Sequence, residues 1–382
     1  DHRDLHSFPT RRSSDLVKNL KKLRTFIRYP LSLYKGNKYY VPSLFMDEMN
    51  TLRSDKNPAF KEAKARYWLA YKDGKLAGRI AGIHVPRHEV KWGEKFLRFG
   101  WIDFIDDPEV SSALIKTVEN WAAELGMQGI HGPLGFTDLD REGMLIDGFD
   151  EVATMATIYN YPYYQKHIEA QGFAKDVDWV EYEIILSGEY MPKIEKTAAL
   201  VAKKYNLHLL NGSKKDLLKY APQLFDVLDV AYRQLYGTYP LSKEQVQGYI
   251  DSYFGFAIPE YIPIVLDEHD KVVAFGIAFP SFSQALQKSR GDLLPFGFLH
   301  FLKALKKNQI ADLYLVGVLD EYRGKGVNAM LITQIYHGFM KHGVKVVEGN
   351  PNLEDNMNVQ TMWKFFNNRI RKRRRCFVKH IN

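Results

Sequence analysis

The sequence predicts an α/β protein with two similar halves, each built on a mixed β-sheet. Two observations support this prediction. In the C-terminal half, apolar strands alternate with segments of helical periodicity, and one hairpin interrupts the alternation, which is typical of a mixed sheet covered by helices. The N-terminal half shows the same order of elements about 190 residues earlier, a spacing that indicates a tandem duplication and not a solenoid of short repeats.

The elements of the C-terminal half can be assigned from apolar periodicity and from capping residues. Ser242, with Gln245 three residues later, forms a capping box that starts a helix. The polar segment 267–271 separates two apolar runs, as in a hairpin. We expect helices at 214–235, 243–253, 326–342 and 356–366, and strands at 207–210, 261–266, 272–279, 312–319, 344–349 and 373–380.

The N-terminal half repeats this plan. Asp73 and Gly74 lie between two apolar runs and give the strongest hairpin signal in the chain. Gly172 suits the left-handed residue that ends a helix. We expect a hairpin at 67–83, helices at 109–125 and 161–171, further strands at 99–105 and 179–186, and a strand or loop that begins at 129–132.

The most informative stretch joins an apolar strand to an apolar-periodic helix through Arg323, Gly324, Lys325 and Gly326. Such a turn directs several backbone N–H groups toward one point at a helix N-terminus, where the helix dipole favours an anion. The two glycines lack a Cβ and let the main chain approach a phosphate closely, and Arg323 and Lys325 add positive charge. The stretch predicts a diphosphate site; an ordinary glycine-containing turn is the alternative.

This stretch resembles the acyl-CoA pyrophosphate loop of the GNAT acetyltransferase superfamily, whose pattern is Arg/Gln-x-x-Gly-x-Gly/Ala. Here the pattern reads Arg323-x-x-Gly326-x-Asn328, so the last position departs from it. A second fragment, from Asn356 to Trp363, has the spacing of the GNAT pattern Asn-x-x-Ala-x-x-Leu-Tyr, with Trp at the last position. The expected order of elements also matches the GNAT fold along the whole C-terminal half.

The resemblance implies two tandem GNAT-like mixed-sheet domains. We expect a degenerate copy at 17–187 and a copy with the acyl-CoA loop at 188–382. Only the second copy should bind CoA, because the matching position of the first copy, 104–112, has three acidic residues and no glycine. Residues 1–16 look like translated adapter or vector sequence, and we expect them to be a disordered leader outside the fold.

In GNAT proteins the strand before the glycine loop pairs with the pantetheine arm, and one of its N–H groups holds the thioester oxygen. By position, these roles fall to 316–318, with Val318 as the N–H donor. No spacing such as His-Glu-x-x-His occurs, so we expect no metal site. The resemblance implies acetyl-CoA as acyl donor, bound by Val316, Val318, Arg323, Gly324, Lys325, Gly326, Val327, Asn328, Ala329 and Asn356.

Acyl transfer to an amine needs a deprotonated nucleophile, a polarised thioester carbonyl and a proton for the leaving thiolate. The usual general acid of the family is a Tyr, but the matching residue is Trp363, whose indole N–H cannot serve as an acid. Tyr314 and Tyr336 are alternative donors, although we favour a packed aromatic residue for each. Glu348, at the end of a strand, is the candidate base, with a salt bridge to the basic tail as the alternative.

The net charge of +8 is concentrated at 369–375, where six of seven residues are basic. Such a run can bind nucleic acid, line a solvated hairpin edge or contact the phosphates of CoA. We favour the last two over nucleic acid, because the rest of the chain is nearly charge-balanced. The single cysteine, Cys376, excludes an internal disulfide and suits a reducing compartment. No apolar run approaches the length of a membrane span, so we expect a cytoplasmic protein.

These observations predict an acyl-CoA-dependent N-acyltransferase, most simply an N-acetyltransferase, acting on a small-molecule or peptide amine. The resemblance leaves open the acceptor, the acyl length and the oligomeric state, since variable loops build the acceptor pockets. Two alternatives remain: a Fem-type aminoacyl-tRNA-dependent transferase, which lacks the glycine loop, and a non-catalytic acyl-CoA-binding protein, which Trp363 would fit. We interpret the apolar segment 293–307, with its basic end, as a lid or packing element, with a membrane-surface helix as the alternative.

Overall fold

The structure, a computed structural model, describes residues 12–187 and 191–381. Its strands are β1 Arg12–Leu16, β2 Lys64–Lys72, β3 Lys75–His84, β4 Phe96–Phe104, β5 Gly129–Gly132, β6 Met144–Asp147, β7 Ala174–Ile185, β8 His208–Leu209, β9 Ile264–Leu266, β10 Val272–Pro280, β11 Ile310–Val318, β12 Val346–Gly349, β13 Asn352–Leu353 and β14 Asn367–His380. Its α-helices are α1 Leu20–Leu33, α2 Phe45–Thr51, α3 Pro86–Trp92, α4 Pro108–Glu124, α5 Tyr163–Glu169, α6 Met191–Tyr205, α7 Lys214–Tyr232, α8 Lys243–Tyr253, α9 Ser283–Ser289, α10 Phe298–Lys306, α11 Asn328–His342 and α12 Met357–Gln360.

One mixed sheet runs through both halves of the molecule. Its strands follow the order β1-β2-β3-β4-β5-β14-β7-β12-β11-β10-β9-β8, while β6 pairs with β14 and β13 pairs with β7. The predicted mixed α/β fold is therefore confirmed, and the hairpins β2–β3 and β9–β10 lie where the turn residues placed them. Among the described residues, no helix is both long enough and apolar enough to cross a bilayer.

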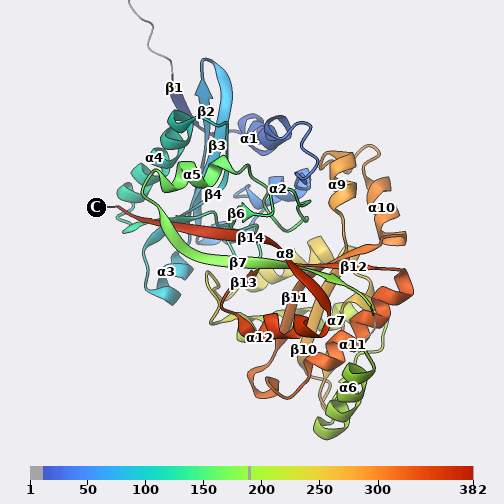
Figure 1. Ribbon diagram of the computed structural model, residues 1–382. Helices are drawn as coiled ribbons and strands as arrows, with labels where there is room; N and C mark the ends of the chain where they lie inside the picture. Colours follow the sequence, from blue (N-terminus) through green and yellow to red (C-terminus); the bar gives the residue numbers. More distant parts are fainter. Residues whose placement is uncertain (1–11, 188–190, 382) are drawn as a thin grey trace, which may run out of the picture.

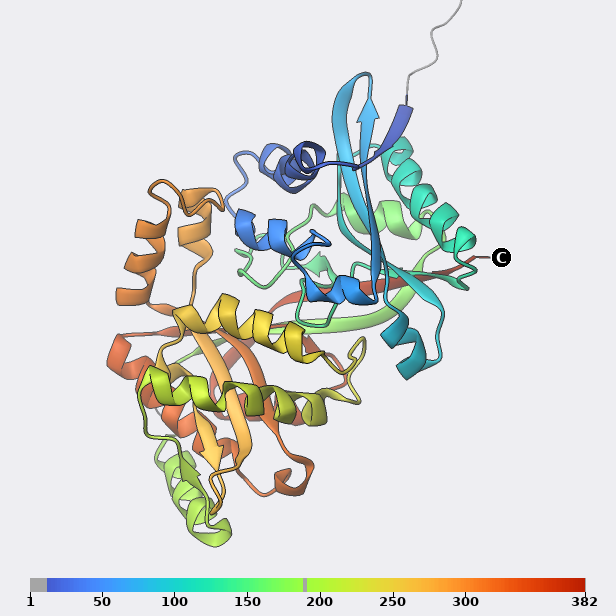
Figure 2. The ribbon, with the colours of Figure 1, turned by 180° about the vertical axis from the view of Figure 1, so that it is seen from behind.

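The helices pack on this sheet in two groups, one in each lobe (Figures 1 and 2). In the N-terminal lobe, α4 packs on β2, β3 and β4. In the C-terminal lobe, α7 packs on β10 and β11 through a cluster that includes Phe275 and Ile277. α11 packs on the opposite face, through clusters that include Ala274 and Ala278, because successive side chains of a strand point to opposite faces.

The two long strands β7 and β14 exchange places between the halves. β14, which ends the C-terminal half, pairs with β5 of the N-terminal half, whereas β7, which ends the N-terminal half, pairs with β12. β7 and β14 also pair with each other, antiparallel, from Asn367↔Ile185 to Val378↔Ala174. Each half is thus completed by the last strand of the other, and in Figure 1 these two strands link the lobes. The division near residue 187 stays a prediction about the sequence.

The basic run 369–375 lies within β14, and most of its side chains pair with acidic residues. It is therefore neither a solvated hairpin edge nor a contact to phosphates, the two interpretations that the sequence favoured. The Lys372 ammonium lies 3.1 Å from a carboxylate oxygen of Glu181, and the Arg374 guanidinium also donates to that carboxylate; all three side chains are buried. Arg375 binds Asp178 through two N–H groups, at 2.7 and 2.8 Å. β14 is a central strand, so these charges meet acidic partners on neighbouring strands and not solvent or phosphate.

Two segments differ from the sequence-based expectation. Arg12–Leu16, which we assigned to the leader, pair with β2 in the antiparallel direction, because β2 offers a free edge on that side; residues 1–11 lie outside the described part of the chain. The segment 356–366 is not one helix. It consists of the single turn α12 and a 3₁₀ segment, Thr361–Phe365, and Phe366 already has an extended backbone that leads into β14.

The buried Glu181 is expected to be a main support of the strand exchange. Burial disfavours its charged form, but Arg374 and Lys372 outweigh this effect and hold its pKa below the usual range. The variant Glu181→Gln leaves two buried cations without a counter-charge, and we expect it to lower the free energy of unfolding by about 3 kcal/mol or more. Urea denaturation followed by circular dichroism measures this loss.

A matched control lies two residues away on the same strand. Glu183 pairs with Arg369 at 2.7 Å, but the Arg369 side chain is 52% exposed, so Glu183→Gln should cost less than about 1 kcal/mol. Equal costs for the two variants would contradict a special role for the buried cluster.

Candidate functional site

An opening lies between β11 and β12. The two strands pair in parallel only from Ile310↔Val346 to Leu313↔Gly349, and β11 continues alone on that edge as far as Val318. The N–H of Leu319 donates to Val273 on β10. Because successive peptide groups of a strand point to alternate edges, the N–H groups of Val316 and Val318 face the opening.

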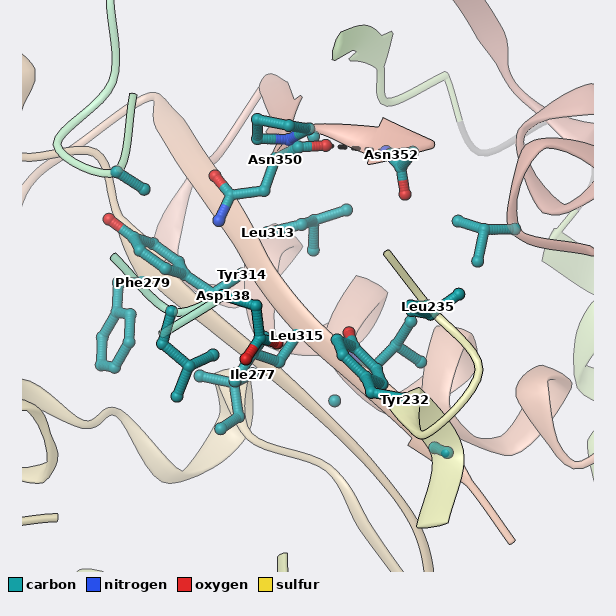
Figure 3. Close-up of a pocket in the computed structure, with 18 of the residues that line it drawn as sticks. Asp138, Tyr232, Leu235, Ile277, Phe279, Leu313, Tyr314, Leu315, Asn350 and Asn352 are labelled. Atoms are coloured by element: carbon teal, nitrogen blue, oxygen red, sulfur yellow. Dashed lines mark hydrogen bonds between the residues drawn. The ribbon is translucent and has the colours of Figure 1, made fainter. Parts of the chain in front are cut away.

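A cavity of about 1610 Å³ passes through this opening, which is larger than the roughly 300–1,000 Å³ usual for a single ligand. On one face of the sheet it is bordered by α6, α11 and the turn before α11. On the other face it is bordered by α7, α8 and the loop at 136–142. Figure 3 shows part of the lining beside β11, with Tyr232, Tyr314 and Asn350 around the strand. The cavity therefore joins two subsites through the sheet.

The turn before α11 presents unpaired amides to the cavity. Gly324 and Gly326 adopt positive φ angles of 71° and 81°, which favour glycine. Among the described residues, no main-chain oxygen accepts a hydrogen bond from the N–H of Gly324, Gly326 or Val327. A Cβ added at Gly324 would meet no atom within 4 Å, so the space beside Gly324 is open, whereas one added at Gly326 would lie 3.2 Å from the Val201 side chain on α6. Free amides and open space at a helix N-terminus fit a bound diphosphate.

The corresponding helix start in the N-terminal half is closed by its own side chain. The carboxylate of Asp107 caps α4 and accepts hydrogen bonds from the amides of Glu109 and Val110, at 2.9 and 3.3 Å. Lys72 donates to the same carboxylate. An anion would have to displace this carboxylate, which supports the expectation that only the C-terminal half offers a diphosphate site.

Two of the predicted cationic contacts are engaged elsewhere. The Arg323 guanidinium donates to Ala231 O at 2.7 Å and pairs with Asp320 at 3.1 Å, although the residue does line the cavity. The ammonium of Lys325 lies over the rings of Tyr205 and Tyr322, and Lys325 does not line the cavity. The remaining residues predicted to bind CoA all line it, namely Val316, Val318, Gly324, Gly326, Val327, Asn328, Ala329 and Asn356.

Helix α6 contributes a further cation, Lys193, which the sequence did not indicate. Lys193 lines the cavity on the same face as the glycine turn, because α6 packs against α11. No described acidic side chain forms an ion pair with it. Lys364 also lines the cavity without an ion pair to a described residue; Lys193 is singled out because its helix packs directly against the helix that follows the glycine turn. The sequence carries no signal for Lys193, since its position depends on the packing of two helices that are far apart in the chain.

The two tyrosines predicted as proton donors lie on opposite faces of the sheet. Tyr314 packs with Phe279 in the core under α7, and its buried hydroxyl has no hydrogen-bond partner among the described residues. Burial, and next the negative charge of Asp312, raises the pKa of this hydroxyl well above its usual value. Tyr336 lines the cavity from α11. Trp363 also lines it, and its buried indole N–H is free to donate a hydrogen bond.

Glu348, the predicted base, does not line the cavity. It is buried and pairs with Arg371, which also binds Glu151 at 2.7 Å. Burial raises the pKa of Glu348, and the charges of Arg371 and Lys372 oppose this shift. This placement fits the alternative that we considered, a salt bridge to the basic tail, and a catalytic role for Glu348 stays a prediction.

A second carboxylate, which the sequence analysis did not consider, does line the cavity. Asp138 belongs to the loop after β5, and in Figure 3 its carboxylate lies beside Leu315, Ile277 and Tyr232. Burial raises the pKa of Asp138 to about 6, and Arg98 and Lys91 oppose the shift. No described cation forms an ion pair with Asp138. The loop carries no sequence motif, and Asp138 reaches the cavity only because the loop packs against the C-terminal half.

Two other acids near this loop, Asp140 and Asp47, are already engaged. Glu142, in the same loop, also lines the cavity without an ion pair to a described residue, but burial raises its pKa well above the usual value. Asp140 accepts hydrogen bonds from the amides of Phe136 and Thr137, at 2.7 and 3.0 Å. Asp47 accepts one from the hydroxyl of Tyr253 at 3.1 Å. In the described residues, no group of three or more His, Cys, Asp and Glu side chains is arranged to hold a metal ion. The free carboxylate of Asp138 is therefore available for an organic ligand.

Comparison with known proteins places this geometry in a wider class. No family model matches the chain. The chain is 27% identical over 373 residues to Protein YghO of Escherichia coli K12, covering 95% of this chain and 94% of that protein. It is 26% identical over 321 residues to a protein of Caulobacter vibrioides named bacterial ceramide synthase, covering 82% of each.

Two solved structures of low sequence identity share the architecture. A tandem GNAT protein from the clavulanic acid biosynthesis pathway has a TM-score of 0.56 at 12% identity, with 97% of this chain and 98% of that chain covered. A GCN5-related N-acetyltransferase from Anabaena variabilis has a TM-score of 0.50 at 12% identity, with 97% and 73% covered. The chain thus has a GNAT fold, and its arrangement is the tandem one, as the glycine turn and the repeated order of elements predicted.

The amides before α11 can be tested by a substitution that fills the space in front of them. We expect Gly324→Val to weaken CoA binding at least about tenfold, or about 1.4 kcal/mol, because a branched side chain would occupy the space that a phosphate needs. Isothermal titration calorimetry of the full chain with CoA measures this change.

Gly343 offers a matched control at the other end of α11. It has a similar φ of 75°, and an added Cβ there also meets nothing within 4 Å. Gly343→Val should therefore impose the same backbone strain and leave CoA affinity unchanged. Parallel losses in the two variants would mean that strain, and not the blocked amides, explains the effect.

Proposed function

We propose that the protein transfers an acyl group from acyl-CoA, in the simplest case acetyl-CoA, to the nitrogen of an amine. One observation carries this proposal: a single cavity connects the open amides before α11, through the gap between β11 and β12, to the free carboxylate of Asp138. A donor can enter on one face of the sheet and an acceptor on the other. The GNAT-like acyltransferase fold supports the proposal.

On the donor face, the main chain supplies most of the contacts. The amides of Gly324, Gly326 and Val327 receive the diphosphate, and Lys193 adds a positive charge. The pantetheine arm then follows the open edge of β11. The N–H of Val316 has one weak contact, 3.5 Å to the hydroxyl of Tyr232, so it is available to donate a hydrogen bond to the pantetheine arm. The N–H groups of Val316 and Val318 polarise the thioester carbonyl.

On the acceptor face, Asp138 acts as the base. As the amine nitrogen attacks the carbonyl carbon, an N–C bond forms, the C–S bond breaks, and the amine proton passes to the Asp138 carboxylate. The thiolate of CoA leaves and takes a proton from water or from the buried hydroxyl of Tyr314. A carboxyl with a pKa near 6 is deprotonated at neutral pH and remains basic enough to accept this proton.

The acceptor subsite favours an amine with a substantial apolar part. Its volume, together with that of the donor subsite, exceeds what one ligand requires. Much of its wall is apolar, including Phe225, Phe254, Ile277, Phe279 and Leu315. A small polar amine would leave this surface in contact with trapped water, whereas an alkyl or aromatic group would cover it.

A direct test of the proposal follows thiol release from acetyl-CoA in the presence of a panel of primary amines. We expect turnover, and we expect kcat/KM to rise with alkyl chain length by about fourfold per buried CH₂, since each contributes about 0.8 kcal/mol. CoA binding without turnover on any amine would favour the non-catalytic alternative. A lack of CoA binding would favour the tRNA-dependent alternative.

The role of Asp138 predicts a specific pH dependence. The base works only when it is deprotonated, so kcat/KM of the wild type, expressed per neutral amine, should rise with pH through about 6 and then level off. Asp138→Asn should remove this rise and lower the rate by about 10²–10⁴-fold, with little change in CoA affinity.

Glu348→Gln is the informative companion variant, because Glu348 is the competing candidate for the base. We expect Glu348→Gln to keep the rise near pH 6, even if the loss of the Arg371 partner lowers stability. If the rise disappeared with Glu348→Gln and persisted with Asp138→Asn, the base would be Glu348.

A further inference from the structure

A cluster of exposed apolar side chains lies on the hairpin formed by α9 and α10. Five large apolar residues are concentrated between 294 and 302, which we call the hairpin patch. They are Leu294, Phe296, Phe298, Leu299 and Leu302, with exposures of 79%, 71%, 41%, 52% and 47%. The other exposed large apolar residues are scattered over several elements, as is normal for a protein surface. Such a concentration of exposed large apolar side chains within nine residues indicates an interaction site.

The hairpin patch does not serve the cavity. No described residue from 283 to 307 lines the cavity, so the interpretation of this segment as a lid is wrong. The packing interpretation holds only for the inner face, where Phe301 is buried and stacks on Phe282 at 5.3 Å. The patch lies on the outer face, and in Figure 2 the hairpin projects from the C-terminal lobe.

The hairpin is held firmly at its base, so the exposure of the patch is not explained by a frayed segment. Arg28 forms an ion pair with Asp292 through two N–H groups, at 2.9 and 3.1 Å. The N–H of Phe45 donates to Gly291 O at 2.9 Å. These contacts tie the turn between α9 and α10 to the N-terminal lobe.

The charges around the patch are almost entirely positive. Five basic side chains on the hairpin are exposed and form no ion pair with a described residue, namely Lys288, Arg290, Lys303, Lys306 and Lys307. The one acidic residue between 283 and 307 is Asp292, which Arg28 already neutralises. Lys303 and Lys306 also complement the dipole at the end of α10, but this accounts for neither the apolar patch nor the other cations.

We propose that the α9–α10 hairpin binds the surface of an anionic lipid bilayer. Apolar and aromatic side chains flanked by lysines are the composition of an interfacial anchor, in which the apolar group enters the boundary of the acyl chains. Each nearby Lys or Arg strengthens binding to an anionic surface. The proposal commits to a bilayer because the unpaired charges on the hairpin are of one sign and complement anionic headgroups.

Co-sedimentation of the full chain with vesicles tests this proposal. We expect binding to phosphatidylcholine vesicles that contain phosphatidylglycerol, and at least about tenfold weaker binding to pure phosphatidylcholine. The double variant Phe296→Ser/Leu299→Ser should bind the anionic vesicles at least about tenfold more weakly. Both positions are exposed, so the fold should be preserved, and circular dichroism checks this.

Two matched controls test whether the loss of vesicle binding is specific to the hairpin, or follows from any loss of exposed apolar side chains or of positive charge. Val90→Ser/Leu200→Ser removes two apolar side chains that are 88% and 61% exposed elsewhere and should bind as the wild type does. The triple variant Lys303→Gln/Lys306→Gln/Lys307→Gln should lose vesicle binding. Its control, with Gln in place of the exposed lysines 196, 203 and 215, changes the net charge equally and should retain it.

The outcomes that overturn the proposal are equally definite. Equal vesicle binding by the patch variant and the wild type would exclude the hairpin as the anchor. A dimer in sedimentation velocity that the patch variant abolishes, without vesicle binding, would show that the patch joins two copies of the chain. These measurements use no CoA, so their failure is distinguishable from a failure of the proposed acyl transfer.

Discussion

The exchange of β7 and β14 is the constraint on which the rest of the structure depends. These strands form the centre of a single sheet, and the buried Glu181 binds Lys372 and Arg374 across them. Arg374 also donates to the main-chain oxygens of Ile158 and Gly143. The same cluster that joins the halves therefore fixes the end of the loop that carries Asp138. Without the exchange, the acceptor face of the cavity would lose the part of its wall that this loop supplies.

The two halves share one structural element, a helix that follows a strand, but its N-terminal amides are capped by a side chain in only one half. Both start a helix directly after a strand, where free amides attract negative charge. In the N-terminal half, Asp107 supplies that charge from within the chain. In the C-terminal half, Gly324 and Gly326 leave the amides open to a ligand. The N-terminal half contributes Asp138 to the cavity instead, so the proposed reaction needs both halves although CoA is proposed to bind only one of them.

Local features were predictable from the sequence, and features that depend on contacts between the halves were not. The capping box at Ser242, the Asp73-Gly74 hairpin and the glycine turn each depend on a few neighbouring residues, and the structure shows all three. The GNAT fold followed from their order. The single helix expected at 356–366 failed because the chain must extend early to enter β14.

The pairing of the basic run could not be predicted, since its partners Glu181 and Asp178 lie on a strand of the other half. The positions of Asp138 and Lys193 at the cavity could not be predicted for the same reason, because both residues reach it only through packing between distant segments. By contrast, the salt-bridge alternative considered for Glu348 followed from charge alone, and the structure shows it with Arg371. The sequence thus predicted that Glu348 could pair with the basic run, but it did not predict the shape of the cavity.

The measurement that tests the central claim most directly is amide hydrogen exchange, resolved by residue, with and without CoA. The account predicts slower exchange at Gly324, Gly326 and Val327 and along the open edge of β11 at Val316 and Val318. It also predicts unchanged exchange at the start of α4, where Asp107 already occupies the amides. Protection by CoA that omitted the turn before α11, or that appeared at α4 instead, would contradict the account.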